Sequence, residues 1–153
     1  MAAWGHLYVD GKKMSKSIGN VLYIEDLTDK GFSEKYIRFF LIYGAYRKRR
    51  NFTWQNLAET SHKLDDFKDA IGKLRKANGR ASTLRAKTLA HSVAVILNKH
   101  MNNDLDVRGT FDALHKLVSR LVWFALKGEL SIQEAGSVEA DLREVDRVLQ
   151  VIF

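Results

Sequence analysis

The chain has 153 residues, enough for one domain, or one with a small appendage, to bury a hydrophobic core without help from disulfides. It contains no cysteine, which excludes disulfide bonds and thiolate metal sites and is compatible with a reducing cytoplasm. No apolar run approaches the roughly 20 residues that span a bilayer, and no signal-peptide pattern is found, so we expect a soluble, cytoplasmic protein.

The net charge of +7 is unevenly distributed along the chain. Residues 1–50 carry 10 Lys and Arg against 5 Asp and Glu, residues 51–87 carry 8 against 4, and residues 88–153 carry 7 against 9. Because a concentrated positive surface attracts polyanions by neutralising phosphates, nucleic acid is the first partner to consider. A basic excess that serves only solubility is the alternative.

The chain begins with patterns that are typical of short strands. His6–Val9 and Lys12–Met14 are expected to form a hairpin around Asp10-Gly11, a pair that suits a type I′ turn because both positions need positive φ. Val21–Ile24 is a further short apolar run, and its length favours another strand.

Two short helices are expected next. The first runs from Glu25 to Lys30 and stops at Gly31, and the second is capped by Ser33 and continues to about Tyr43. Its apolar residues predict a heavily buried helix: Tyr36, Ile37, Phe39, Phe40, Leu41 and Ile42.

From residue 53 onward the apolar residues recur at helical spacing in four segments. These run from Thr53 to Asn78, from Ser82 to Met101, from Arg108 to Lys127, and from Ser131 to the end. Amphipathic helices with short connections bury their apolar stripes most simply as an antiparallel bundle.

The sequence therefore predicts a mainly α fold in two parts. A small α+β segment with a β-hairpin occupies residues 1–52, and an antiparallel bundle of about four helices occupies residues 53–153. A capping box of Ser131 with Glu134 is expected to start the last helix.

The histidines and tryptophans favour structural roles. His62, His91, His100 and His115 show no spacing with Asp or Glu that is typical of a metal site, so no metal is expected. Trp54, Trp123 and the phenylalanines lie at helical spacing, which favours core packing over base stacking.

The most specific motif is the run Lys13, Met14, Ser15, Lys16 and Ser17, followed by Ile18-Gly19-Asn20. Two flexible ammonium groups beside small serines can approach a polyphosphate and stabilise charge that develops on departing pyrophosphate. A lysine-rich solvated loop is the alternative. The run resembles the KMSKS loop of class I aminoacyl-tRNA synthetases, a resemblance that implies ATP and phosphate binding by these five residues.

In those enzymes the loop closes over ATP held by a nucleotide fold that lies earlier in the chain. Only 12 residues precede the loop here, so we expect that fold to be missing. Gly5-His6 is the only segment similar to the upstream His-x-Gly-His motif, and we interpret it as part of the first strand.

Nearly the whole chain resembles the C-terminal half of cysteinyl-tRNA synthetases. The similar segments are Val9 to Asn20, Arg38 to Leu41, Tyr46-Arg47, Asn51 to Thr53, and Met101 to Asp106. The resemblance implies a stem-contact region around residues 18–52, which faces the inner side of tRNA, and a helical bundle after it. The zinc-ligating cysteines and the anticodon domain of that family have no counterpart, which implies truncation at both ends.

The chain departs from the family pattern at two places. Where relatives often have a proline-containing link, Arg47, Lys48, Arg49 and Arg50 form a run of four cations, which favours phosphate contact, with a solvated connection as the alternative. Val107-Arg108-Gly109 replaces a Thr-Pro-acidic helix start, which leaves Asp106 as the expected N-cap.

These patterns predict a module related to cysteinyl-tRNA synthetase that binds tRNA or another phosphate-rich ligand and does not aminoacylate alone. Nucleic acid would meet Lys12, Arg47, Lys48, Arg49 and Arg50. No intrinsic cofactor is expected, and ATP would bind only if a catalytic fold completed the site.

Two alternatives stay open. The chain is a fragment or split subunit of an active cysteine–tRNA ligase, with a catalytic-domain partner in trans. Otherwise it is a protein-interaction module, or a relative of the mycothiol-pathway cysteine ligase. Met1-Ala2-Ala3 resembles a genuine or added start more than an internal cut, and no membrane association is expected.

Overall fold

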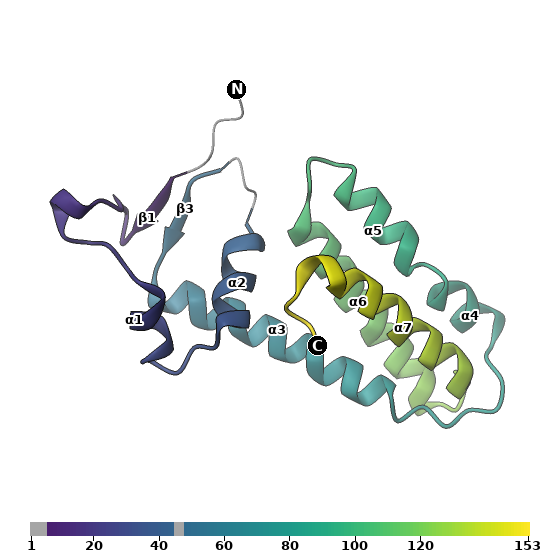
Figure 1. Cartoon of the computed structure of the whole chain (residues 1–153). Helices are drawn as coiled ribbons and strands as arrows, with labels where there is room; N and C mark the ends of the chain where they lie inside the picture. Colours follow the sequence, from purple (N-terminus) through teal and green to yellow (C-terminus); the bar gives the residue numbers. More distant parts are fainter. Residues whose placement is uncertain (1–5, 45–47) are drawn as a thin grey trace. The chain divides into compact units, whose positions relative to one another are not determined.

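A computed structural model of the chain describes residues 6–44 and 48–153 (Figure 1). The chain divides into two compact units, Met1–Leu64 and Asp65–Phe153. Helix α3, Trp54–Leu74, begins in the first unit and continues into the second. Among the described residues, no helix is both long and apolar enough to cross a membrane.

The first unit contains a three-stranded sheet with the order β2-β1-β3. Strand β1 (Leu7–Val9) pairs antiparallel with β2 (Lys12–Lys13) and parallel with β3 (Arg50–Phe52). The turn residues Asp10 and Gly11 have φ of 48° and 79°, so both adopt the positive φ that a type I′ turn requires. The predicted hairpin is confirmed.

The strand expected at Val21–Ile24 is absent, and that prediction was wrong. Helix α1 begins there instead and spans Ile24–Thr28, because the Asp26 carboxylate accepts a 2.8 Å hydrogen bond from the Tyr23 backbone N–H and starts a helical turn. The additional strand is β3, which the sequence pattern did not indicate. Its buried Phe52 and the hydrogen bond from the Gly11 N–H to the Asn51 side chain fix it beside β1.

Helix α2, Glu34–Ile42, follows an extended Ser33 at the N-cap position, although the Ser33 side chain accepts no capping hydrogen bond. Leu41 is 51% exposed, so the expectation that the whole apolar set is buried was wrong for this residue. One hydrophobic core joins α1, α2, β3 and α3 through Leu27, Ile37, Phe40, Phe52 and Leu57.

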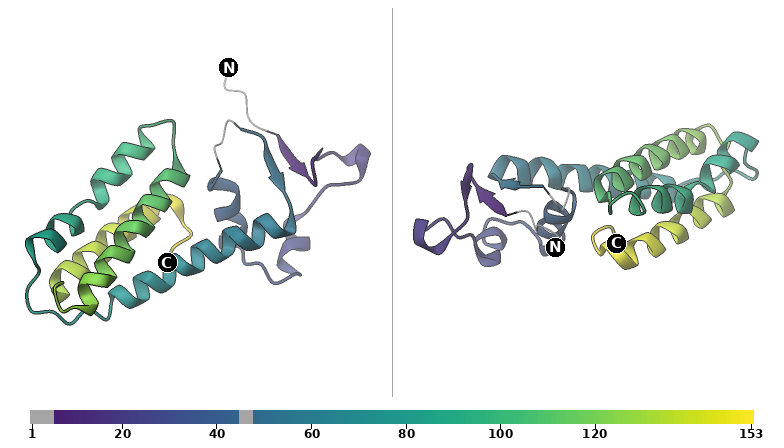
Figure 2. Two further views of the ribbon diagram at one scale, coloured as in Figure 1. Left: turned by 180° about the vertical axis from the view of Figure 1, so that it is seen from behind. Right: turned by 90° about the horizontal axis from the view of Figure 1, so that it is seen from above.

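The second unit is helical. It contains the later part of α3 together with α4 (Leu84–Ala90), α5 (Val93–Met101), α6 (Val107–Leu126) and α7 (Ile132–Leu149). Helices α4 and α5 each contact both α6 and α7 (Figure 1, Figure 2). A mainly α fold with a small N-terminal sheet is therefore confirmed.

The segment expected to form one helix from Ser82 to Met101 is divided into α4 and α5. At the break, the His91 ring nitrogen lies 2.8 Å from the Lys87 carbonyl oxygen, and the Ser92 hydroxyl donates to the Thr88 carbonyl at 3.0 Å. Side chains that bond to carbonyls four residues earlier compete with the backbone ladder and often bend helices. These local bonds accompany the interruption.

Helix α3 contacts the rest of the second unit through aromatic packing in the core and an ion pair on the surface. Phe67 meets Phe111 of α6 edge to face, with ring centroids 4.8 Å apart, and both side chains are almost completely buried. On the surface, Arg75 donates to both carboxylate oxygens of Glu139 in α7, at 2.8 and 2.9 Å. This bidentate pair lowers the pKa of the Glu139 carboxyl.

The caps of the last two helices follow their sequence signals with one difference. Asp106 is the N-cap of α6 and accepts a 2.9 Å hydrogen bond from the Gly109 N–H, as expected. Ser131 caps α7 and accepts from the Glu134 N–H at 3.2 Å. The Ser131 N–H, however, donates to the Ser82 hydroxyl at 2.8 Å, so Ser82 takes the reciprocal role expected of Glu134.

Candidate functional site

The lysine-rich loop at residues 13–20 has a fixed backbone. Asn20 ties its two ends together, because the Asn20 side-chain oxygen accepts from the Ser15 N–H at 2.9 Å and its amide donates to the Lys13 carbonyl at 3.2 Å. Gly19 closes the turn with φ of 72°, a conformation that side chains disfavour. The Asn20 hydrogen bonds therefore hold the two ends of the loop together.

The loop side chains divide into anchors and exposed groups. Met14 and Ser15 are half-buried, and the Met14 N–H donates to the Leu7 carbonyl at 3.1 Å. Lys13, Lys16 and Ser17 are exposed, and the hydroxyl oxygens of Ser15 and Ser17 lie 3.0 Å apart. Two ammonium groups and a hydroxyl thus face solvent from a short, preorganised loop, the donor types that bind phosphate.

One face of the sheet combines an aromatic ring with cations from distant parts of the chain. In the strand register Tyr8 lies opposite Lys13 on one side and Asn51 on the other, so these three side chains share a face. The Arg49 guanidinium carbon lies 5.5 Å from the centroid of the Tyr8 ring. Lys13 and Arg49 therefore flank the same tyrosine, which the sequence did not single out.

The other predicted cations have different surroundings. Lys12 lies opposite Val9, which packs against the core, so Lys12 and Lys13 extend from opposite faces of the sheet. Lys48 is exposed, and Arg47 lies outside the described residues.

Arg50 is half-buried, unlike the exposed Lys48 and Arg49 before it. Its guanidinium carbon lies 4.2 Å from the Phe40 ring centroid, and its side chain occupies the space in which a Cβ at Gly44 would sit. These contacts give Arg50 a packing role in the first unit. The run of four cations thus does not form one uniform surface.

The two described candidates for aromatic packing at helical positions differ from each other. Trp54 packs edge to face against Phe52, with centroids 5.2 Å apart, but it is 36% exposed, so it lies at the border of the core and not inside it. Trp123 is 51% exposed, so its expected place in the core was wrong. In the parts of the chain that the structure describes, no group of three or more His, Asp and Glu side chains could hold a metal ion.

Comparisons with known proteins separate the two units. A family model described as the tRNA synthetases class I (C) catalytic domain matches residues 2–62, almost the same span as the first unit. Alignments with individual relatives extend over nearly the whole chain, including the second unit.

Three such relatives are cysteine–tRNA ligases. That of Chlamydia pneumoniae is 32% identical over 149 residues, covering 96% of this chain and 31% of the relative. That of Opitutus terrae is 35% identical over 144 residues, covering 94% and 26%. That of Brachyspira hyodysenteriae is 37% identical over 150 residues, covering 96% and 31%. The chain thus spans about a third of the length of the curated relatives it matches.

Proposed function

Since the chain is related to the cysteine–tRNA ligases, we propose that it binds tRNA through the exposed cations of its first unit. The exposed cations assigned to this contact are Lys12, Lys13, Lys16, Lys48 and Arg49. The first unit carries 11 Lys and Arg against 6 Asp and Glu, so a polyanion is its natural partner.

The placement of Lys13 and Arg49 on either side of Tyr8 carries the proposal. The two cations come from separate segments and lie on one face of the sheet. Together they can neutralise neighbouring phosphates of one RNA strand. The tyrosine ring between them offers a flat surface for a ribose or a base. A sheet face that served only solubility would not require this convergence.

The loop would supply a second set of phosphate contacts. Asn20 holds the backbone, so Lys16 and Ser17 need little further ordering when an anion arrives. Lysine acts here as a mobile point charge, which suits phosphates whose positions differ between ligands.

The test is a titration of the full chain against tRNA at several salt concentrations. Each phosphate contact that is lost should reduce the slope of log K against log salt by about 0.9. K13A/R49A is therefore expected to lower the slope by about 2 and to weaken binding at least tenfold at low salt. Binding that is absent, or that does not depend on salt, would overturn the proposal.

The matched control removes two exposed arginines from the second unit. R80A/R147A changes the net charge by the same amount, and Arg147 pairs only at the surface with Glu144. If this variant weakens tRNA binding as much as K13A/R49A does, total charge is sufficient and the specific role of the sheet face is wrong.

A second candidate function is completion of a cysteine–tRNA ligase in trans. It is favoured by the match of residues 2–62 to a model described as a catalytic domain, together with the preorganised loop. Of the described residues, Lys13, Lys16 and Ser17 fit the phosphates of ATP. ATP would supply the activated phosphoanhydride, and the lysines would stabilise charge on its phosphate oxygens.

This function is tested by mixing the chain with a protein that contains the nucleotide fold of a cysteine–tRNA ligase. ATP–pyrophosphate exchange that needs both chains, and that falls at least a hundredfold with K16A, would support it. Exchange that is the same with and without the chain would contradict it.

A further inference from the structure

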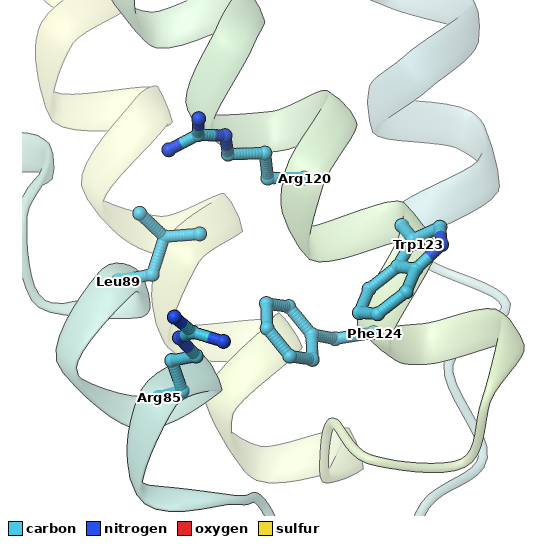
Figure 3. Close-up of a pocket in the computed structure, with 5 residues that line it drawn as sticks. All are labelled: Arg85, Leu89, Arg120, Trp123 and Phe124. Atoms are coloured by element: carbon cyan, nitrogen blue, oxygen red, sulfur yellow. The ribbon is translucent and has the colours of Figure 1, made fainter.

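The second unit contains a pocket that the sequence pattern did not indicate. It has a volume of about 350 Å³ and is lined by Arg85, Leu89, Arg120, Trp123 and Phe124. Figure 3 shows that the first two side chains come from α4 and the other three from α6. The lining combines two guanidinium groups with apolar and aromatic surface.

The two arginines are not neutralised locally. Both are exposed, and neither forms an ion pair with the residues that the structure describes. No carboxylate contributes to the lining, and the Lys127 ammonium adds a further positive charge 3.8 Å from the centroid of the Trp123 ring. The pocket lining thus carries two positive charges and contains no carboxylate.

Trp123 and Phe124 form the aromatic wall of the pocket. This wall is partly exposed, so part of its apolar surface is not stabilised by burial. Trp123 is 51% exposed, and its ring lies edge to face with Phe124, with centroids 5.0 Å apart at 82°. An exposed indole beside unpaired cations is the usual composition of a surface that holds a flat anionic ligand. Leu89 on the facing helix limits the pocket on its apolar side.

We propose that this pocket binds one nucleotide unit, with the phosphate between Arg85 and Arg120 and the base against Trp123 and Phe124. A phosphate alone would leave the aromatic wall in water, and a neutral aromatic molecule would leave both arginines unsatisfied. The volume lies within the range of small-ligand pockets. The proposal does not depend on the function assigned to the first unit, because every residue in it belongs to the second.

The nucleotide unit can come from a free nucleotide or from an RNA strand. An adjoining pocket of about 650 Å³ shares Leu89 and Arg120 with the first and adds His115 and Lys116. This extension gives a neighbouring nucleotide of a strand both space and a further cation. A free nucleotide would therefore fill the first pocket alone, whereas an RNA strand would also occupy the adjoining pocket.

The experiment follows the indole N–H signals of the full chain by NMR during titration. The chain has three tryptophans, Trp4, Trp54 and Trp123, and W123F identifies the signal of interest. AMP and a hexamer of adenylate are the ligands, with adenosine as the base alone and pyrophosphate as the phosphate alone. We expect AMP or the hexamer to shift the Trp123 signal saturably, and the two partial ligands to bind at least tenfold more weakly.

R85A/R120A is expected to reduce the affinity at least tenfold, whereas R80A/R147A removes the same charge elsewhere in this unit and leaves it within twofold. Both substituted pairs are exposed, so the variants should fold, and circular dichroism checks this. A hexamer that binds more than tenfold tighter than AMP identifies an RNA strand as the ligand, and equal affinities identify a free nucleotide.

Three results would overturn the proposal. The first is a Trp123 signal that neither AMP nor the hexamer shifts at about 10 mM, a concentration that would nearly saturate a site with a Kd of about 1 mM. The second is a shift that R85A/R120A leaves unchanged. The third is an equal shift with polyglutamate, which would identify the groove as a general site for acidic polymers.

Discussion

The two units differ in the aromatic and charged contacts that they make. In the first unit a short sheet carries Tyr8 and Arg49 on an outer face, and Arg50 covers Phe40 at the edge of a small core. In the second unit Phe67 and Phe111 meet inside a helical core, while acidic and basic residues nearly balance at 12 against 14. In the first unit, the residues proposed to bind a ligand therefore lie beside a small hydrophobic core.

This difference predicts that the second unit supplies most of the stability. Burial of large side chains scales with the free energy of unfolding, and most of the fully buried large residues lie in the second unit.

F111A should destabilise the second unit by about 3–5 kcal/mol, because it removes a nearly fully buried ring that packs against Phe67 and leaves a cavity. Denaturant unfolding followed by circular dichroism measures the change. L126A, at a side chain that is 84% exposed on the same helix, should change stability by less than about 0.5 kcal/mol. Equal effects of the two variants would contradict the assigned core.

G79A is expected to cost about 1–3 kcal/mol. Gly79 pairs with Ser131 in an isolated bridge, and its carbonyl accepts from the Ile132 N–H at 3.1 Å. A Cβ at this position would overlap the carbonyl of Leu130. That carbonyl belongs to the backbone and cannot rotate away as a flexible side chain could. G136A, at a helical glycine with open space around it, should be neutral or stabilising in the same unfolding assay.

The sequence predicted those parts of the fold that depend on neighbouring residues. Asp10-Gly11 required positive φ and adopted it, and Asp106 capped the helix that follows it. Strand β3 could not be predicted, because its three residues become a strand only by pairing with β1, far away in the chain. The helix break at His91 is local, but apolar spacing alone does not show that the His91 and Ser92 side chains bond to carbonyls of the preceding turn.

The candidate sites show the same division. The loop residues Lys13 to Ser17 were found from their order alone, and of these Lys13, Lys16 and Ser17 are exposed. The convergence of Lys13 and Arg49 on Tyr8 could not be found, because it depends on the register of two strands on either side of β1. Trp123 was wrongly placed in the core, because helical spacing does not show which face of a helix a neighbour leaves uncovered.

D106A should destabilise the second unit by about 0.5–2 kcal/mol at neutral pH, since α6 loses its N-cap. The hydrogen bond from the Gly109 N–H, and then that from His100 at 3.0 Å, lower the pKa of the Asp106 carboxyl. A lowered pKa in the folded state means that the charged form contributes stability above the unfolded pKa. This contribution is lost as pH falls below about 4.

The expected readout is a difference in unfolding free energy between wild type and D106A that shrinks below about pH 4. D106N keeps an oxygen acceptor for the Gly109 N–H but not the charge, so it should cost less than D106A and lose its deficit over the same pH range. A deficit that stays constant down to about pH 2 would show that the charge contributes nothing.

N20A should have the smallest effect on stability, about 0.5–1.5 kcal/mol, because Asn20 makes two hydrogen bonds in an exposed loop of the first unit. Its main consequence should be a less ordered loop. The loop loses its hydrogen bonds to Ser15 and Lys13, so Lys16 must be ordered when a phosphate binds. Amide hydrogen exchange at residues 13–20 should accelerate at least tenfold. Affinity for tRNA should fall less than in K13A/R49A, because N20A removes order and leaves every charge in place; a larger fall would make loop shape, and not the cations beside Tyr8, the main determinant of binding.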